Sequence, residues 1–253
     1  MVRYLLLGLI QGITEFLPVS SSAHLLLAQR WLGLGEPGPL LVAFAHLGTL
    51  GAVLLWFFRD LAGLAQGLWR GNPEARGYWG ALGLGTLPLV LAAGVARGRL
   101  DQVFRTEWVP FFLLANGLFL VGVGRTPSPL PCRTLGLREA LAVGLAQMLA
   151  ILPGLSRSGL TLATGLRLGL EGKEVFRFSF LLGIPAIVGG ALLAAWEGSA
   201  GVESWAGLSL TAGAAFLSGL FTLALLARAV RRRALWPFGL YCLLLGLLAL
   251  SWK

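Results

Sequence analysis

The stretch QGITEFLPVSSSAH, residues 11–24, decides how this chain folds, because it breaks an apolar helix with a carboxylate, a proline and three serines. The apolar run that leads into it, residues 4–17, is shorter than the about 20 residues needed to span a bilayer. The proline and serines end this helix, and a second short helix is expected at about 23–34. We therefore predict a re-entrant hairpin that enters and leaves by one face of a membrane.

A second stretch, PGLSRSG at residues 153–159, repeats the arrangement. It follows a short apolar helix at 135–152 and precedes another at about 160–170, and the proline-rich segment 126–134 separates the two halves. Three apolar spans follow each hairpin: about 39–58, 80–97 and 109–125 in the first half, and about 176–196, 206–227 and 235–252 in the second. An odd number of spans turns the second half over.

The fold class that follows is an all-α integral membrane protein with an inverted-topology repeat. Each half is a re-entrant helical hairpin plus three transmembrane helices, with repeat 1 at about 1–125 and repeat 2 at about 135–253. The whole chain, 1–253, is expected to form a single membrane domain. In such repeats, binding sites lie at the repeat interface near the membrane midplane.

The composition points to lipid as the main solvent. Of the 253 residues, 57% are hydrophobic and 12% are charged, whereas a soluble domain is about a quarter charged. The net charge of +9 comes almost wholly from arginine. We attribute it to loops that orient the spans and contact anionic headgroups, and expect no nucleic-acid partner. The two cysteines are too few for a disulfide framework.

Loop charge predicts the orientation of the chain. Arginine-rich loops are assigned to the cytoplasm: 59–79, 125–138, 167–177 and 228–234. The loop at 197–205 has two glutamates and no basic residue, so it is assigned to the outer side. Both termini are then outside, and the first hairpin dips in from the outer face.

Glu15 is an ionisable residue at membrane depth, where a charge is costly and needs a partner. It shares a helix face with Gln11, four residues earlier. One interpretation is a structural clamp on the serine turn. The other is that Glu15 binds a divalent cation or sets the charge of a neighbouring base.

Ser20, Ser21 and Ser22 offer hydroxyls, free N–H groups and a helix N-terminus together, which favours an anion site. One of them is also expected to cap the following helix. His24 is either a packed residue or, beside Glu15, an acid–base group, since its usual pKa of about 6.5 suits proton transfer. His46, in the middle of a span, is interpreted as structural.

Arg157 is the strongest single indication of a phosphate ligand, because a guanidinium binds phosphate oxygens in a bidentate fork. The alternative is an arginine that reaches to the headgroups. Ser156 and Ser158 flank it, and Gly154 allows close approach of the backbone to a ligand. Gln147 mirrors Gln11 and is expected to support the centre of the site.

At these two motifs the sequence resembles the undecaprenyl pyrophosphate phosphatases, the bacitracin-resistance family of integral membrane enzymes. The stretch at 11–24 is similar to the family's (Glu/Gln)-xxx-Glu motif with its serine–histidine turn, and PGLSRSG is similar to the family's PGxSRSG signature. Position 11 is Gln rather than Glu, and Ala23 stands where many members have Gly. The likeness extends over nearly the whole chain.

The resemblance implies a membrane hydrolase of bacterial inner membranes that converts undecaprenyl pyrophosphate to undecaprenyl phosphate and recycles this carrier for cell-wall synthesis. By motif position, Glu15 would support metal and charge, with Gln11 as a second candidate ligand. Ser21 and His24 would be nucleophile or base, and Arg157 would hold the pyrophosphate. A divalent cation, Mg²⁺ or Ca²⁺, and a polyprenyl pyrophosphate lipid are implied as cofactor and substrate.

Two other functions remain open at this point. A transporter or flippase of an anionic polyprenyl-phosphate lipid would also use inverted repeats and re-entrant hairpins. A non-catalytic scaffold would use neither Glu15 nor Arg157. The sequence leaves the oligomeric state open, with a homodimer as one alternative.

Overall fold

The computed structural model describes residues 1–33, 38–96, 106–124, 134–197 and 204–251. Every regular element in these ranges is a helix. Two segments singled out in the sequence, the proline-rich 126–134 up to residue 133 and most of the 197–205 loop, lie outside the described residues.

The helices keep the order predicted from the sequence. The first half contains α1 (Val2–Phe16), α2 (Ser21–Leu32), α3 (Pro39–Trp56), α4 (Phe58–Trp69), α5 (Pro73–Ala96), the 3₁₀ turn η1 (Thr106–Trp108) and α7 (Val109–Gly124). The second half contains α8 (Leu137–Leu149), α9 (Arg157–Arg167), α10 (Gly172–Glu197), α11 (Trp205–Arg231) and α12 (Trp236–Ser251).

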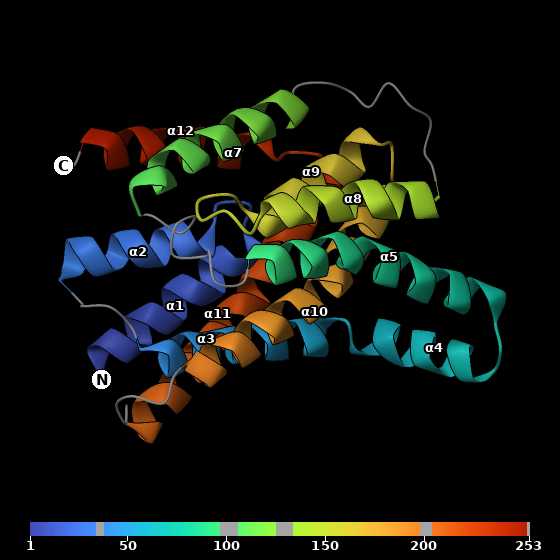
Figure 1. Cartoon of the computed structure of the whole chain (residues 1–253), viewed down its shortest axis with the longest axis horizontal. Helices are drawn as coiled ribbons and strands as arrows, with labels where there is room; N and C mark the ends of the chain where they lie inside the picture. The colour runs from blue at the N-terminus through green and yellow to red at the C-terminus, as the bar shows by residue number, and fades with distance from the viewer. Residues whose placement is uncertain (34–37, 97–105, 125–133, 198–203, 252–253) are drawn as a thin grey trace.

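Four helices, α3, α5, α10 and α11, are long and apolar enough to cross a membrane. The other two predicted spans, α7 and α12, are apolar helices of 16 residues each, which is about 24 Å at 1.5 Å per residue. The prediction of an all-α, multi-pass membrane protein is confirmed. The segment 59–79, predicted as a loop, instead contains α4 and the start of α5. The arginines of this segment are typical of a loop, but α4 is a helix that projects from one end of the molecule (Figure 1).

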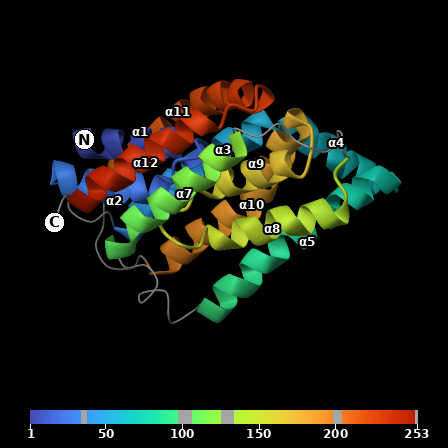
Figure 2. The ribbon, with the colours of Figure 1, turned by 90° about the horizontal axis from the view of Figure 1, so that it is seen from above.

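The two hairpins lie toward opposite ends of the molecule. Helices α1 and α2 lie near the end that carries both termini, whereas α8 and α9 lie toward the other end (Figure 1). Each first hairpin helix packs on a long helix of the other half: α1 on α11, and α8 on α5, which run side by side in both views (Figures 1 and 2). The inverted relation of the halves stays a prediction.

Small residues let α1 approach α11 closely. A side chain at Gly8 would collide with the backbone of Thr211, and one at Gly12 with the Ser218 hydroxyl and the Ala215 carbonyl. Such contacts between backbones are typical of helix pairs in membranes, where small residues replace the hydrophobic effect as the basis of association. This packing fixes the helix that carries Glu15.

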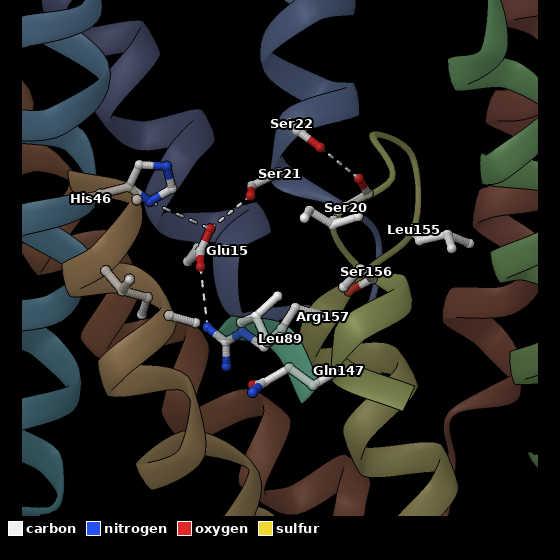
Figure 3. A pocket seen from close by; sticks show the side chains of 15 residues that line it. Glu15, Ser20, Ser21, Ser22, His46, Leu89, Gln147, Leu155, Ser156 and Arg157 are labelled. Atoms are coloured by element: carbon white, nitrogen blue, oxygen red, sulfur yellow. Dashed lines mark hydrogen bonds and ion pairs between the residues drawn. The ribbon is translucent and has the colours of Figure 1, made fainter. Parts of the chain in front are cut away.

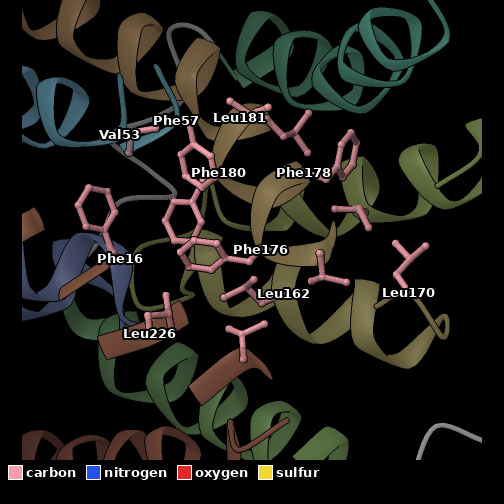
Figure 4. Packing of buried hydrophobic residues seen from close by; sticks show 14 of the residues in the cluster. Phe16, Val53, Phe57, Leu162, Leu170, Phe176, Phe178, Phe180, Leu181 and Leu226 are labelled. Atoms are coloured by element: carbon pink, nitrogen blue, oxygen red, sulfur yellow. The ribbon is translucent and has the colours of Figure 1, made fainter. Parts of the chain in front are cut away.

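A cluster of phenylalanines packs around the end of α1 (Figure 4). Phe180 of α10 is at its centre, with ring centroids 5.5 Å from Phe16 of α1, 6.1 Å from Phe57 between α3 and α4, and 4.7 Å from Phe176 of α10. Aromatic pairs at these distances stabilise a core beyond the area that they bury. The cluster therefore holds α1, α3 and α10 in one arrangement next to residue 15.

Candidate active site

The first turn begins where α1 ends at Phe16, because Pro18 cannot continue the helix. Ser20 has φ +69°, a conformation that non-glycine residues rarely adopt and that is often found at functional sites. Helix α2 then begins at Ser21, two residues earlier than predicted. As a result, Ser21 and Ser22 lie in the first turn of a helix rather than in the loop.

The second turn also leads directly into a helix, α9. Gly154 has φ +108° and packs against the backbone of α7 at Val109, a place with no room for a side chain. The Ser156 hydroxyl accepts a hydrogen bond from the Gly159 amide at 3.2 Å and so caps α9. Helix α9 therefore begins at Arg157, so this side chain leaves the helix at its N-terminus.

The two turns are bonded directly to each other. The Ser156 and Ser158 hydroxyls lie 3.4 and 3.2 Å from the carbonyl oxygen of Leu17, to which they donate. They also lie 3.1 Å from each other. Ser158, predicted to bind substrate, is thus buried against the first turn, and Gly154 is buried against α7. Their predicted roles toward substrate stay predictions, while their contacts here are structural.

Asn116 of α7 joins the turns a second time. Its Nδ2 donates to the Pro18 carbonyl at 3.0 Å, and its Oδ1 accepts from the Ser156 amide at 3.1 Å. The residue is 0% exposed, so water cannot replace these bonds. Sequence reasoning missed Asn116; the available signal was an asparagine inside an apolar helix, where a polar side chain needs a partner.

The joined turns bring Arg157 to Glu15. Arg157 NH2 lies 3.2 Å from Glu15 Oε1, with the Glu15 side chain 9% exposed. The other carboxylate oxygen, Oε2, accepts from the Ser21 hydroxyl at 2.7 Å and from Gln11 Nε2 at 3.1 Å. Three donors from Arg157, Ser21 and Gln11 therefore fix the position of this carboxylate.

Helix α10 supports the guanidinium from behind. The Arg157 Cζ lies 5.9 Å from the ring centroid of Phe180, within the range of a cation–π contact. A side chain at Gly183 would displace the guanidinium, so this glycine provides the space that Arg157 fills. The arginine is therefore directed into the protein and not toward the headgroups.

A cavity of about 240 Å³ lies between the two turns (Figure 3). Polar side chains from both hairpins line one part of it: Glu15, Ser20, Ser21, Ser22, Gln147, Ser156 and Arg157, together with His46 of α3. Apolar residues of α5, the second turn and α10 line the rest, among them Leu89, Ile151 and Ile187. The cavity thus suits a ligand with a polar head and an apolar tail.

The polar part of the cavity favours an anion. The N-termini of α2 and α9 both border it at Ser21 and Arg157, and helix N-termini attract negative charge. Both polar atoms of Gln147, which is 0% exposed, lack a hydrogen-bond partner within the described residues, as does Arg157 NH1. Buried polar atoms left without a partner are costly and point to a ligand that completes them.

His24, predicted to act beside Glu15, is held elsewhere. Its Nδ1 lies 2.7 Å from the Ser20 carbonyl oxygen and its Nε2 lies 2.7 Å from the Tyr241 hydroxyl. The ring stacks on Tyr241 of α12 with centroids 5.6 Å apart. It does not belong to the residues that line the cavity, so its acid–base role stays a prediction. His46, interpreted as structural, is the histidine that lines the cavity.

Comparison with known proteins identifies the family of this chain. The family of bacitracin resistance protein BacA matches residues 4–248, a range that includes both turns. The chain belongs to this family. Its curated relatives include an undecaprenyl-diphosphatase of Syntrophotalea carbinolica, 39% identical over 96% of this chain and 95% of the relative. Another, of Rhodopirellula baltica, is 38% identical over 98% of this chain and 96% of the relative.

The range that the BacA family matches includes both Glu15 and Arg157. The two relatives above are named undecaprenyl-diphosphatases. A third relative, from Nocardioides sp., carries the same name at 37% identity over 97% of this chain. The resemblance stated from the two motifs is thereby confirmed.

Proposed function

We propose that this protein hydrolyses undecaprenyl diphosphate, releasing inorganic phosphate and leaving undecaprenyl phosphate. The observation that carries the proposal is the contact between Arg157 of the second turn and Glu15 of the first, 3.2 Å apart in a cavity at two helix N-termini. A diphosphate offers the anionic oxygens that these groups need, and a polyprenyl chain suits the apolar wall. The names of the curated relatives support the same substrate.

Binding is the first task of the site. The Arg157 guanidinium, the Ser22 hydroxyl and the free N–H groups of α2 would hold the diphosphate oxygens. Gln147 would give the remaining hydrogen bonds from its unpartnered amide. Because these groups sit in packed helices, they are oriented before substrate arrives, and this lowers the cost of reaching the transition state.

Glu15 accepts the proton of the attacking oxygen. The Ser21 hydroxyl donates to Glu15 Oε2 at 2.7 Å, so a hydroxyl bound at this carboxylate is placed for proton transfer. A new P–O bond forms at the terminal phosphorus, and the bond to the bridging oxygen breaks with undecaprenyl phosphate as the leaving group. If water supplies the attacking oxygen, inorganic phosphate is released in this one step. If Ser21 supplies it, a phosphoserine forms, and a water molecule that gives its proton to Glu15 then attacks the phosphorus, breaks the Ser21 O–P bond and releases phosphate.

A divalent cation, Mg²⁺ or Ca²⁺, is part of this proposal. Within the described residues there is no group of three or more histidine, cysteine, aspartate or glutamate side chains that could hold a metal by itself. Glu15 is the carboxylate that lines the cavity, and the buried Gln11 Oε1 lacks a partner. One carboxylate plus substrate phosphates is a usual Mg²⁺ site. When bound, the cation would neutralise charge on the phosphoryl oxygens.

The orientation is proposed from loop charge: a bacterial plasma-membrane protein with both termini and the cavity mouth on the outer side. In Figure 1 both termini lie at one end and α4 at the other. Val2 and Trp69 are exposed near these two ends. A thiol reagent that cannot cross membranes should label Val2→Cys in intact cells and Trp69→Cys only after lysis; the reverse pattern would invert the orientation. Dimerisation stays a prediction.

Release of phosphate tests the function. Protein purified in detergent should release inorganic phosphate from undecaprenyl diphosphate, and a chelator should stop the release until Mg²⁺ or Ca²⁺ is restored. Arg157→Ala is the matched inactive control. If the wild type binds the lipid but releases no phosphate with either cation, the enzyme proposal fails and transport of the lipid becomes the better explanation.

A further inference from the structure

His46 has a place in the cavity that its sequence position does not suggest. It lies on α3, its side chain is 25% exposed, and it lines the cavity together with Glu15 and Arg157. Figure 3 shows its ring beside Glu15 and Ser21. A histidine at this depth in a membrane protein, open to a polar cavity, calls for a role toward the ligand.

Gln11 determines which ring nitrogen of His46 carries the proton. Gln11 Nε2 lies 3.0 Å from His46 Nδ1 and 3.1 Å from Glu15 Oε2. The amide nitrogen has two hydrogens, one for each of these acceptors. The carboxylate can only accept, which fixes the amide with its nitrogen on this side. His46 Nδ1 must then accept as well, so the neutral ring carries its proton on Nε2.

Glu15 does not compete for this nitrogen. The distance between His46 Nδ1 and Glu15 Oε2 is 4.0 Å, which is too long for a hydrogen bond. Because Nδ1 is occupied by Gln11, the Nε2–H group is the donor that His46 has left for a ligand in the cavity.

His24 has the opposite arrangement. Its Nδ1 faces the Ser20 carbonyl oxygen, which can only accept, so the proton of the neutral ring is on Nδ1. Its Nε2 then accepts from the Tyr241 hydroxyl. Both ring nitrogens of His24 are therefore used within the protein.

We propose that His46 binds the diphosphate, with its Nε2–H donating a hydrogen bond to a phosphoryl oxygen, and that Gln11 is the positioning residue that keeps the ring in this form. The inference rests on the proposed function for the identity of the ligand. Charge spreads over the phosphoryl oxygens in the transition state, where a fixed donor is most effective. No proton is transferred in this role.

The first experiment reads the two tautomers directly. The chain has two histidines, so NMR of ¹⁵N-histidine-labelled protein in micelles shows two imidazole rings. The spectra are recorded at about pH 8, above the usual histidine pKa. The signals that disappear in His24→Gln belong to His24, and the others belong to His46. We expect the His46 proton on Nε2 and the His24 proton on Nδ1. Gln11→Met, which removes the amide at similar size, should abolish the preference at His46 and leave His24 unchanged. A His46 proton on Nδ1, or a tautomer unaffected by Gln11→Met, would overturn the inference.

The second experiment measures phosphate release from undecaprenyl diphosphate. His46→Ala should lower kcat/KM by roughly 10- to 100-fold, the effect of losing one hydrogen bond to a charged group. His46→Gln keeps an N–H donor of similar reach and should recover most of that loss. Leu47→Ala, at the exposed neighbouring position on α3, controls for damage to the helix and should behave as wild type.

The outcomes separate the roles. Equal losses in His46→Ala and His46→Gln would contradict a donor and indicate a proton acceptor, while wild-type kinetics in both would remove His46 from the site. If the wild-type protein releases no phosphate at all, the proposed function fails, whereas the tautomer measurement still decides the local arrangement.

Discussion

At the residue scale, the pair Glu15 and Arg157 was predictable because charged side chains at membrane depth are rare and need partners. The structure adds that each is held from a second direction, Glu15 by Ser21 and Arg157 by the ring of Phe180. The contact joins residues 142 positions apart. Residue type and depth therefore indicated both members, and the hydrogen bonds between the two turns bring them together.

The two histidines differ in how their places in the sequence relate to the cavity, which His46 lines and His24 does not. His24 adjoins the serine turn in sequence, but its partner Tyr241 lies 217 positions away on α12. His46 lies 35 positions from Gln11, with apolar neighbours that gave no indication of a site. A place near the serine turn in sequence does not put a side chain in the cavity, because successive residues of a helix point in different directions.

Replacing Arg157 with lysine tests the guanidinium geometry. Arg157→Lys keeps the charge but loses the planar fork that would bind Glu15 and phosphate oxygens together. We expect kcat/KM for undecaprenyl diphosphate to fall by roughly 10- to 100-fold, as for loss of a charge-assisted hydrogen bond. Phosphate release at fixed substrate concentrations measures this, and near-normal turnover would exclude the bidentate role.

At the scale of elements, the hairpins and most spans could be predicted from apolar length and from the prolines that end helices. Helix α4 could not, because the arginines around it resemble a loop. The starts of α2 and α9 were placed two to three residues late. Ser20 stands at the N-cap of α2 without a side-chain capping bond, whereas the Ser156 hydroxyl caps α9, so Ser21 and Arg157 are the first residues of their helices. Helix boundaries depend on such caps, which composition alone does not show.

Asn116 connects three elements, so its loss should affect both stability and activity. Asn116→Leu would leave the Pro18 carbonyl and the Ser156 amide without partners, at about 1–3 kcal/mol for each buried group. We expect a lower midpoint of thermal unfolding in detergent and a reduced kcat. Leu118→Ala, at an exposed position on the same helix, is the control. An Asn116→Leu protein with the midpoint and kcat of the wild type would show that the turns hold together without this residue.

At the scale of the whole molecule, the cavity exists because two segments from different halves meet. The sequence indicated that the two turns belong together, since each has a proline, serines and a preceding glutamine at similar spacing. It could not indicate how they are joined, because the bonds run from Ser156 and Ser158 to the backbone of Leu17, which has no sequence signature. Nor could it show that α3 completes the site with His46.

The central claim is that the two turns act as one catalytic site, and a double-mutant cycle on phosphate release tests it most directly. Glu15→Gln, Arg157→Lys and the double variant would be compared with wild type for kcat/KM on undecaprenyl diphosphate. Residues that act as a unit are strongly non-additive, so the account predicts that the double variant loses little more than the worse single variant. Losses that multiply would contradict the account, because they would show that Glu15 and Arg157 act independently.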